Sequence, residues 1–382
     1  MQDYNLNSLN PMKFLEMGKK RAIVIANASS EKPNVDKAIN QMAKKLHPKE
    51  QYLLVKEVIE VGPNAKKYIL EGETCAYFKA GQYLTITINI DGNTYSRPYS
   101  LTSSPKESLD NIYNIMIKRV PDGIVSNYIL DNWQIGTKVI ASDPQGFFTY
   151  EELRDAKSII GVAGGSGITP FVSLAKAIKD GDELCDLTIL YGSRNVNDIL
   201  LKDELDDIVK TCPKVQVVYV LSDDEKEGYE HGFISLELIK KYQPETPSSI
   251  FICGPEQMHT YLDNELSKLD IEKKYIRHEV IGSNLLNLDK KLVQITVIQN
   301  GESKVIAAST NDTILQSLEK NGIKTLSRCR SGECGFCHSR LISGDVHISL
   351  KQDRRRKADE IYGYLHPCCT YPLTNIVIEI PN

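Results

Sequence analysis

Between residues 51 and 150, short segments rich in Val, Ile, Tyr and Thr are separated by turn signals such as Gly62-Pro63 and Asp91-Gly92. Runs of β-branched and aromatic residues favour strands, and dipeptides of this kind favour tight turns between them. The strands expected from the pattern cover residues 52–59, 67–70, 83–90, 112–118 and 138–141. Short strands joined by tight turns predict a small antiparallel β-barrel.

After Tyr150, short apolar runs alternate with segments of helical periodicity. The runs expected to form strands cover residues 158–163, 186–191, 215–221 and 249–253. The helices expected between them cover residues 170–179, 203–209 and 235–241. Such an alternation predicts a parallel sheet with helices on both faces.

The two ends of the chain carry different patterns. Apolar residues recur at helical spacing near the N-terminus, which predicts an amphipathic helix; they are Val35, Ala38, Ile39, Met42 and Leu46. Near the C-terminus, residues 292–298 and 303–308 are expected to form a hairpin over a helix at residues 314–320.

A chain of 382 residues is long enough for several domains, each with its own core. A linker is expected at residues 282–291. The predicted organisation is an N-terminal helical extension (1–50), an antiparallel β-barrel (51–150), an α/β parallel-sheet domain (151–283) and an α+β domain (284–382).

Cysteines near the C-terminus carry the most specific chemical signal. Cys329, Cys334 and Cys337 are spaced C-x4-C-x2-C, and the adjacent Cys368 and Cys369 follow about thirty residues later. This is the thiolate spacing of a plant-type [2Fe-2S] cluster, and the small residues of the loop let backbone N–H groups turn toward the sulfurs. Four thiolates also suit a structural zinc ion, although zinc ribbons usually pair two C-x2-C knuckles. Adjacent residues of an extended segment point in opposite directions, so spacing leaves the fourth ligand open between Cys368 and Cys369.

Composition bounds the compartment and the partners. The chain has nine cysteines, and those outside the cluster motif are scattered, which is unlike a disulfide framework and indicates a reducing cytoplasm. A formal net charge of -4 indicates neither nucleic acid nor an anionic membrane as a partner. The apolar run at residues 22–26 is too short for a signal sequence or a membrane span.

The C-terminal domain is mildly basic. Residues 284–382 hold thirteen Lys and Arg against ten Asp and Glu, and Arg354, Arg355, Arg356 and Lys357 form one run. Such a run is commonly a solvated helix face. The alternative is a docking patch for an acidic electron acceptor.

A polar motif stands within the barrel pattern. Arg97, Pro98, Tyr99 and Ser100 are expected on a loop that follows a strand. Arg97 offers forked donors to an anion, Tyr99 offers an aromatic face, and Ser100 offers a hydrogen bond to the edge of a ring. An aromatic cofactor that carries a phosphate group suits all three.

A second candidate phosphate site lies further along the barrel. Gly123, Ile124, Val125 and Ser126 precede and begin a helix expected at residues 125–131. The free N–H groups and the dipole at the start of a helix favour a phosphate there.

A glycine-rich turn follows the first strand of the α/β region. Its candidate residues are Gly164, Gly165, Gly167, Thr169 and Pro170. Glycines let the backbone approach a pyrophosphate, and the helix N-terminus meets its charge. The turn departs from G-x-G-x-x-G, because Pro170 stands where the last glycine would be.

The last strand predicted in the α/β region ends in Cys253, Gly254 and Pro255. A lone cysteine at a strand end is most often a small core residue. On the residues alone, this segment therefore indicates packing.

With these motifs in this order, residues 51–382 resemble the ferredoxin-NADP reductase superfamily in its modular form. In that form a flavin domain, an NAD(P) domain and a plant-type [2Fe-2S] domain follow one another, as in phenylacetyl-CoA-type, oxygenase and hybrid-cluster-protein reductases. The resemblance implies an FAD-binding barrel, an NAD(P)-binding α/β domain and a ferredoxin domain of the β-grasp class.

The resemblance also implies roles for single residues of the flavin site. Arg97 is similar to the phosphate ligand of the R-x-Y-S motif, Tyr99 to the ring stacker and Ser100 to the partner of flavin N5. The turn from Gly123 to Ser126 is similar to the flavin pyrophosphate site, and Glu279 to the acidic residue near the flavin after the last strand.

The remaining motifs carry over in the same way. The turn from Gly164 to Pro170 resembles the dinucleotide loop, and the segment from Cys253 to Pro255 resembles the motif beside the nicotinamide ring. Cys368 begins a C-x-x-x-P segment similar to that of the family's final cluster ligand, which implies Cys368 as the fourth ligand.

The resemblance leaves two choices of cofactor. FAD is expected rather than FMN, because the Gly123 to Ser126 turn resembles a pyrophosphate site. NADH and NADPH both remain candidates: Ser193 and Arg194 stand where an acidic residue for a ribose hydroxyl is usual, and they could hold a 2′-phosphate.

The expected function is electron transfer from NAD(P)H through FAD to a [2Fe-2S] cluster and on to an acceptor protein, such as an oxygenase or a hybrid-cluster protein. Ser100, Cys253 and Glu279 are the residues expected at the reacting atoms. The alternatives are a module that senses redox state or stores electrons without turnover, and an NAD(P)H diaphorase whose cluster is not essential.

Overall fold

The computed structural model of the 382-residue chain describes residues 11–27, 38–46, 48, 50–268, 271–279, 290–348 and 353–381. The chain divides into two compact units, residues 1–45 and 46–382. Near the N-terminus lie α1 (Pro11–Ala26) and α2 (Ala38–Leu46). The predicted amphipathic helix is confirmed at α2, whereas Val35 and residues 282–289 of the predicted linker lie outside the described residues. Among the described helices, none combines the length and the apolar character that a membrane crossing requires.

The predicted antiparallel barrel is a six-stranded sheet with the strand order β4-β3-β6-β1-β2-β5. Its elements are β1 (Glu50–Gly62), β2 (Ala65–Gly72), β3 (Tyr83–Ile90), β4 (Asn93–Ser100), β5 (Ile112–Lys118), α3 (Ile124–Asn132) and β6 (Lys138–Ser142). A bridge between Leu101 and Ile115 joins the end of β4 to β5, so the two edges of the sheet meet. The bridge closes the sheet at the end of β4, while the rest of β4 pairs with β3 on one side.

The prediction that Arg97 to Ser100 form a loop is wrong, because these residues form the second half of β4. Asp91 and Gly92 have positive φ angles of 50° and 82°, which suits a two-residue hairpin turn between β3 and β4. The two strands then pair in register as far as Tyr83 and Ser100. Pro98 is tolerated because β4 lies at one end of the strand order, where one side of the strand needs no ladder.

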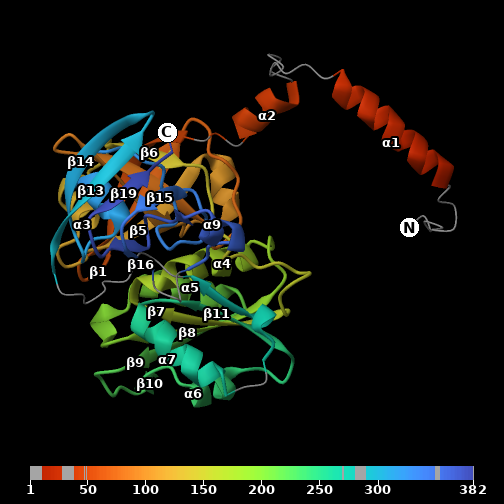
Figure 1. Cartoon of the computed structure of the whole chain (residues 1–382). Helices are drawn as coiled ribbons and strands as arrows, with labels where there is room; N and C mark the ends of the chain where they lie inside the picture. The colour runs from red at the N-terminus through yellow and green to blue at the C-terminus, as the bar shows by residue number, and fades with distance from the viewer. Residues whose placement is uncertain are drawn as a thin grey trace. The chain divides into compact units, whose positions relative to one another are not determined.

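The second sheet has the order β10-β9-β8-β7-β11-β12, and its strand pairs are parallel. Its strands are β7 (Ser158–Gly164), β8 (Asp186–Ser193), β9 (Val215–Leu221), β10 (Glu230–His231), β11 (Ser248–Cys253) and β12 (Ile276–Glu279). One core contains residues of α4 (Thr169–Lys179) and α5 (Lys202–Thr211), and a separate core contains residues of α6 (Leu236–Tyr242) and α7 (Glu256–Leu266). The helix pairs cover opposite faces of the sheet (Figure 1), which confirms the predicted α/β architecture.

The C-terminal region forms a mixed sheet with the order β14-β13-β19-β15-β17 and a two-stranded sheet of β16 and β18. The elements are β13 (Leu292–Gln299), β14 (Glu302–Ser309), α8 (Ile314–Lys320), β15 (Ser339–Ser343), β16 (Val346–Ile348), α9 (Lys357–Ile361), β17 (Tyr364–Leu365), β18 (Thr370–Pro372) and β19 (Ile376–Glu379). The predicted hairpin and helix are confirmed, and Ile314 and Leu318 of α8 pack in the core of this sheet. Helix-on-sheet packing of this kind agrees with the predicted α+β class.

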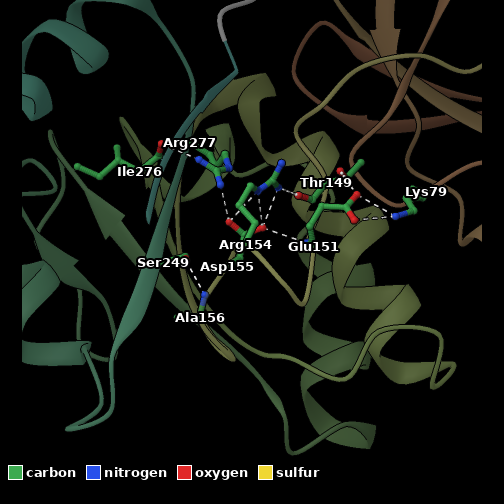
Figure 2. A network of polar contacts seen from close by, with 9 residues as sticks. All are labelled: Lys79, Thr149, Glu151, Arg154, Asp155, Ala156, Ser249, Ile276 and Arg277. Atoms are coloured by element: carbon green, nitrogen blue, oxygen red, sulfur yellow. Dashed lines mark hydrogen bonds and ion pairs between the residues drawn. The ribbon is translucent and has the colours of Figure 1, made fainter. Parts of the chain in front are cut away.

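A polar network lies where the chain passes from the barrel to the parallel sheet (Figure 2). The buried Asp155 carboxylate accepts hydrogen bonds from Arg154 Nη2 at 2.7 Å and from Arg277 Nη2 of β12 at 2.8 Å. The backbone N–H of Glu151 donates to the same carboxylate at 2.9 Å, and the Glu151 side chain pairs with Lys79 Nζ at 2.8 Å. The network therefore ties the barrel to β12, the strand that ends at Glu279.

Candidate functional site

The loop that carries the first three cysteines of the motif folds around its own sulfur atoms. Cys329 and Cys337 are buried and Cys334 is exposed. The Cys334 N–H donates to Cys329 Sγ at 3.4 Å, and the Phe336 N–H donates to Cys334 Sγ at 3.4 Å. Donors of this kind favour the thiolate, which is the form that binds iron. The loop thus has the local structure that its small residues predict.

Cys368 forms hydrogen bonds with the thiols of Cys329 and Cys337, whereas Cys369 contacts the Cys368 thiol and the backbone. Hydrogen bonds with the thiols of Cys334 and Cys368 lower the pKa of Cys329, and a hydrogen bond with Cys368 lowers the pKa of Cys337. The Cys369 thiol donates to the carbonyl oxygen of His366 at 3.5 Å. This placement favours Cys368 as the fourth ligand.

A zinc site would need at least three ligands around one point. Within the described ranges, no group of three or more His, Cys, Asp or Glu side chains is placed to hold a single metal ion. A two-iron cluster divides its four thiolates between two metal atoms, so it does not require that convergence. The C-x4-C-x2-C spacing with a distant fourth cysteine is that of a plant-type [2Fe-2S] cluster, whereas zinc ribbons usually pair two C-x2-C knuckles.

The structure brings Ser100, Glu279 and Cys329 to one small cavity. The cavity has a volume of about 20 Å³ and is lined by Tyr83, Pro98, Ser100, Glu279, Cys329, Ser331 and Glu333. Ser100 comes from β4 of the barrel, Glu279 from β12 of the parallel sheet and Cys329 from the cluster loop. Three segments that are far apart in the sequence thus meet where the flavin motif and the cluster motif face each other.

Arg97 points toward the C-terminal domain. Its Nη1 donates to Glu319 Oε2 of α8 at 3.1 Å and to the Ser96 carbonyl oxygen at 2.7 Å. Within the described residues, the hydrogen bonds of Arg97 are made by Nη1. Tyr99, two residues further along β4, is half-buried, and burial raises its pKa, so the phenol stays neutral.

Glu279 was expected after the last strand, but it is the last residue of β12, a strand that the sequence pattern did not predict. Burial, together with the nearby Glu333 and Cys329, raises the pKa of Glu279 to about 8. Partial desolvation and the nearby Cys329 also raise the pKa of Glu333, which lies at an exposed position of the cluster loop. The Glu279 carboxyl group is therefore mostly protonated at neutral pH, and it can donate a hydrogen bond.

Glu279→Gln is expected to flatten the pH dependence of stability between about pH 4.5 and pH 8. The carboxyl group has an ordinary pKa of 4.5 and a pKa of about 8 in the folded protein. The folded state binds this proton more tightly than the unfolded state, so its contribution to stability is complete below pH 4.5. That contribution is lost as pH rises through 8, at about 1.4 kcal/mol per pH unit.

The measurement is the Tm of the wild type and the variant at pH 5 and at pH 9. The wild type should lose more Tm than Glu279→Gln when the pH is raised. Glu152→Gln, at an exposed position, is the control and should behave as the wild type. Equal losses of Tm in the wild type and in Glu279→Gln would contradict the expectation.

Gly123 precedes α3, and the helix predicted there is confirmed. A Cβ atom at Gly123 would lie 2.6 Å from Ser126 Oγ and 3.0 Å from the Val120 carbonyl oxygen, so the turn is tight. Gly123 has no side chain to cap the helix, so the first N–H groups of α3, which include those of Ile124, Val125 and Ser126, stay open to an anion.

A cavity of about 570 Å³ lies at the glycine-rich turn. Among its lining residues are five that the sequence predicts for the dinucleotide: Gly164, Gly165, Ser193, Arg194 and Pro255. Its volume is within the range of ligand pockets. The positive φ of Gly165, 53°, turns the backbone between β7 and α4 at the edge of this cavity.

The other residues predicted for the dinucleotide site do not line this cavity but pack next to it. They are Gly167, Thr169, Pro170, Cys253 and Gly254. A Cβ atom at Gly167 would lie 2.1 Å from the Cys253 carbonyl oxygen, so the glycine permits the turn and the end of β11 to touch. Cys253 is fully buried, and burial raises the pKa of its thiol. Thr169 and Pro170 are buried in the first turn of α4. Gly254 is also packed, because a Cβ atom there would lie 2.3 Å from Met258 Cε.

Sequence reasoning missed several residues of these cavities. Lys118, at the end of β5, lines the larger cavity although it belongs to the barrel, and Asp198, Phe233 and Tyr261 line it as well. Arg194 Nε donates to Asp198 Oδ2 at 3.1 Å. Glu333 had a sequence signal, because it stands inside the cysteine loop. Lys118, Asp198, Phe233 and Tyr261 had no such signal in the sequence, because the elements that carry them meet only in the folded chain.

Comparison with known proteins finds three family models in chain order. Residues 53–150 match an oxidoreductase FAD-binding domain, and residues 162–264 match an oxidoreductase NAD-binding domain. Residues 297–373 match a 2Fe-2S iron-sulfur cluster binding domain. The matched ranges contain Arg97, the glycine-rich turn and the four predicted cluster cysteines.

Two curated relatives and one solved structure extend these matches. The glycine betaine monooxygenase reductase subunit of Chromohalobacter salexigens is 25% identical over 327 residues, which cover 79% of this chain and 87% of that protein. NADH-cytochrome b5 reductase 1 of Dictyostelium discoideum is 31% identical over 246 residues, which cover 62% of this chain and 84% of that protein. The structure of phthalate dioxygenase reductase has a TM-score of 0.66 at 22% identity and covers 87% of this chain and 98% of that one, which shows a shared fold.

Proposed function

The chain belongs to the ferredoxin-NADP reductase superfamily in its modular form, and from that premise we propose which residues serve each step and which acceptor and donor it uses. It is an oxidoreductase that passes electrons from NAD(P)H through FAD to a [2Fe-2S] cluster and on to an acceptor protein. A hydride carries two electrons and a proton, and bound FAD accepts it and supplies electrons singly. Two one-electron transfers to the acceptor and the release of one proton balance each nucleotide oxidised.

The roles proposed for single residues rest on the cavity that Ser100, Glu279 and Cys329 share. Ser100 bonds the edge of the flavin ring and protonated Glu279 donates a hydrogen bond nearby, so each orients the ring. Cys253 acts as a neutral, buried thiol that shapes the wall beside the nicotinamide and does not act as a nucleophile.

We assign the phosphate groups of FAD to hydrogen-bond donors of Arg97 and of the first turn of α3. Arg97 Nε and Nη2 bind a flavin phosphate, and the start of α3 at Gly123 receives the pyrophosphate. Cys329, Cys334, Cys337 and Cys368 hold the cluster, whose exposed side is at Cys334. That side is the proposed exit for electrons.

The stoichiometry of turnover tests this function. With excess acceptor and no oxygen, about two one-electron acceptor proteins should be reduced for each NAD(P)H consumed, over many turnovers. A storage or sensing module would stop after it had filled its own cofactors. That outcome would overturn the proposed catalytic function.

NADH is the proposed donor. Arg194, the residue that could hold a 2′-phosphate, is paired with Asp198, and its side chain is 72% exposed. Asp198 lines the dinucleotide cavity, where a carboxylate repels a 2′-phosphate and can accept a hydrogen bond from a ribose hydroxyl. The NADH dependence in the name of the Dictyostelium relative agrees with this choice.

Asp198→Asn is expected to lower the preference for NADH over NADPH by about tenfold, because the substitution removes the repelling charge and releases Arg194. The measurement is kcat/KM for each nucleotide with a dye acceptor. Asp203→Asn, an exposed position of α5 outside the cavity, is the control and should keep the wild-type ratio. An unchanged ratio in Asp198→Asn would refute the assignment.

The proposed acceptor is a protein with a one-electron centre, such as the oxygenase component that the relatives' names indicate for those proteins. The basic run near α9 is largely balanced by its own neighbours. Arg355 pairs with Asp353 at 2.7 Å, and Lys357 pairs with Glu360 at 3.2 Å. An acidic acceptor is therefore supported mainly by Arg354 and Arg356, which are exposed, and by the net charge of the domain.

The compartment and the domain boundaries are also part of the proposal. All nine cysteines lie in the described part of the chain, and none of them forms a disulfide there, which supports a reducing cytoplasm. We propose domain boundaries after Tyr150 and after Ser283.

A further inference from the structure

Glu319 is a buried carboxylate on α8 for which neither flavin nor cluster chemistry provides a role. It is 4% exposed and lies in the last turn of its helix. A carboxylate is unfavourable in both respects, because burial removes its hydration and the end of a helix carries a partial negative charge. Its retention there requires strong partners.

The first partners of Glu319 belong to the flavin strand. Arg97 Nη1 donates to Glu319 Oε2 at 3.1 Å, and the Ser96 backbone N–H donates to Glu319 Oε1 at 3.3 Å. Both residues lie in β4, close to Ser100. The carboxylate of the C-terminal domain is therefore bound to both the backbone and a side chain of the flavin motif.

The second partner belongs to the cluster loop. Arg330 Nη1 and Nη2 donate to Glu319 Oε1 and Oε2 at 2.7 and 3.1 Å, which is a bidentate pair. Arg330 follows Cys329 directly and has a φ of 58°, a left-handed conformation that is uncommon for an arginine. Surrounding contacts must hold such a conformation, and the Glu319 carboxylate is the strongest of them.

We infer that Glu319 is a positioning residue that holds the Cys329 end of the cluster loop against β4 and so fixes the path from flavin to cluster. The geometry supports this role because Ser100 of β4 and Cys329 line the same cavity. Each transfer along the path moves one electron from reduced flavin to oxidised cluster, and no bond of Glu319 changes. The inference rests on the proposed function of Ser100 and the four cysteines.

The test is to mix NADH with the holoenzyme anaerobically and to follow flavin bleaching by absorbance and the reduced cluster by freeze-quench electron paramagnetic resonance. In Glu319→Gln loaded with FAD, flavin bleaching should stay within about twofold of the wild type, because α8 contributes no residue to the lining of the nicotinamide cavity. The delay from flavin reduction to cluster reduction should lengthen at least about tenfold, since two buried guanidinium groups lose their shared counter-charge. Glu319→Asp, which keeps the charge, should give an intermediate delay.

Glu204→Gln is a matched control at a different junction. Glu204 of α5 pairs with Lys67 of the barrel at 2.8 Å and with Lys176 of α4 at 2.6 Å, away from the cluster. Its cluster delay should equal that of the wild type. A wild-type delay in a cluster-loaded Glu319→Gln, or an equal slowing in Glu204→Gln, would overturn the inference.

Two further outcomes separate failure of this inference from failure of the proposed function. If Glu319→Gln fails to retain its cluster, Glu319→Asp decides, and a wild-type delay in that variant overturns the inference. If the wild type bleaches its flavin but never reduces its cluster, the proposed function itself fails. The two failures are therefore distinguishable.

Discussion

Cys334→Ser is expected to lower the rate at which NAD(P)H reduces a one-electron acceptor protein by at least about a hundredfold, because loss of a cluster ligand is more severe than the loss of an outer-shell contact. Serine cannot supply the thiolate that Cys334 offers on the exposed side of the cluster loop. Reduction of a two-electron dye should stay within about twofold of the wild type, because the flavin and nicotinamide sites are unchanged. Steady-state rates with the two acceptors measure both effects.

Cys369→Ser is the matched control for this prediction. Cys369 neighbours the proposed fourth ligand, but its thiol donates to the His366 carbonyl oxygen, and a serine hydroxyl can make the same hydrogen bond. This variant should keep its cluster and its rate. If Cys334→Ser instead reduced the protein acceptor at the wild-type rate, the cluster would not be on the path and the diaphorase alternative would hold.

Asp155→Ala is expected to lower the free energy of unfolding by about 3 kcal/mol. The substitution leaves Arg154 and Arg277 without their buried counter-charge and removes the acceptor of the Glu151 N–H (Figure 2). The value lies at the low end for a broken buried pair, because the Arg154 side chain is 34% exposed and water can reach it.

Urea unfolding followed by flavin release measures this loss of stability. Glu152→Ala, an exposed neighbour, is the control and should change stability by less than about 0.5 kcal/mol. A loss below about 1 kcal/mol in Asp155→Ala would show that the network contributes little to the junction.

The sequence predicts best the elements whose own residues determine them. The bounds of β3, β5, β9 and α8 agree with the pattern, because alternating or continuous apolar runs end at clear turn signals. β4 was missed because Pro98 and Arg97 read as a loop, and only the pairing with β3 makes them a strand. α7 was missed because its sequence has few apolar residues, and it gains stability by packing in the core of the sheet.

In the candidate site too, the sequence predicts local motifs but not contacts between distant segments. The cysteine loop and the glycine-rich turn were predictable, because each is a short segment whose chemistry is local. The pairing of Arg97 with Glu319 was not, because the two residues are 222 positions apart and meet only when two domains pack. The raised pKa of Glu279 was equally hidden, since it depends on burial beside the cluster loop.

Anaerobic reduction of the purified holoenzyme by NADH, followed by visible absorbance and electron paramagnetic resonance, tests the central claim most directly. The account predicts that NADH bleaches the flavin and that a paramagnetic signal of the reduced [2Fe-2S] cluster then develops. It would be contradicted by a flavin that NADH bleaches completely while the cluster stays oxidised, or by a protein whose four cysteines hold zinc.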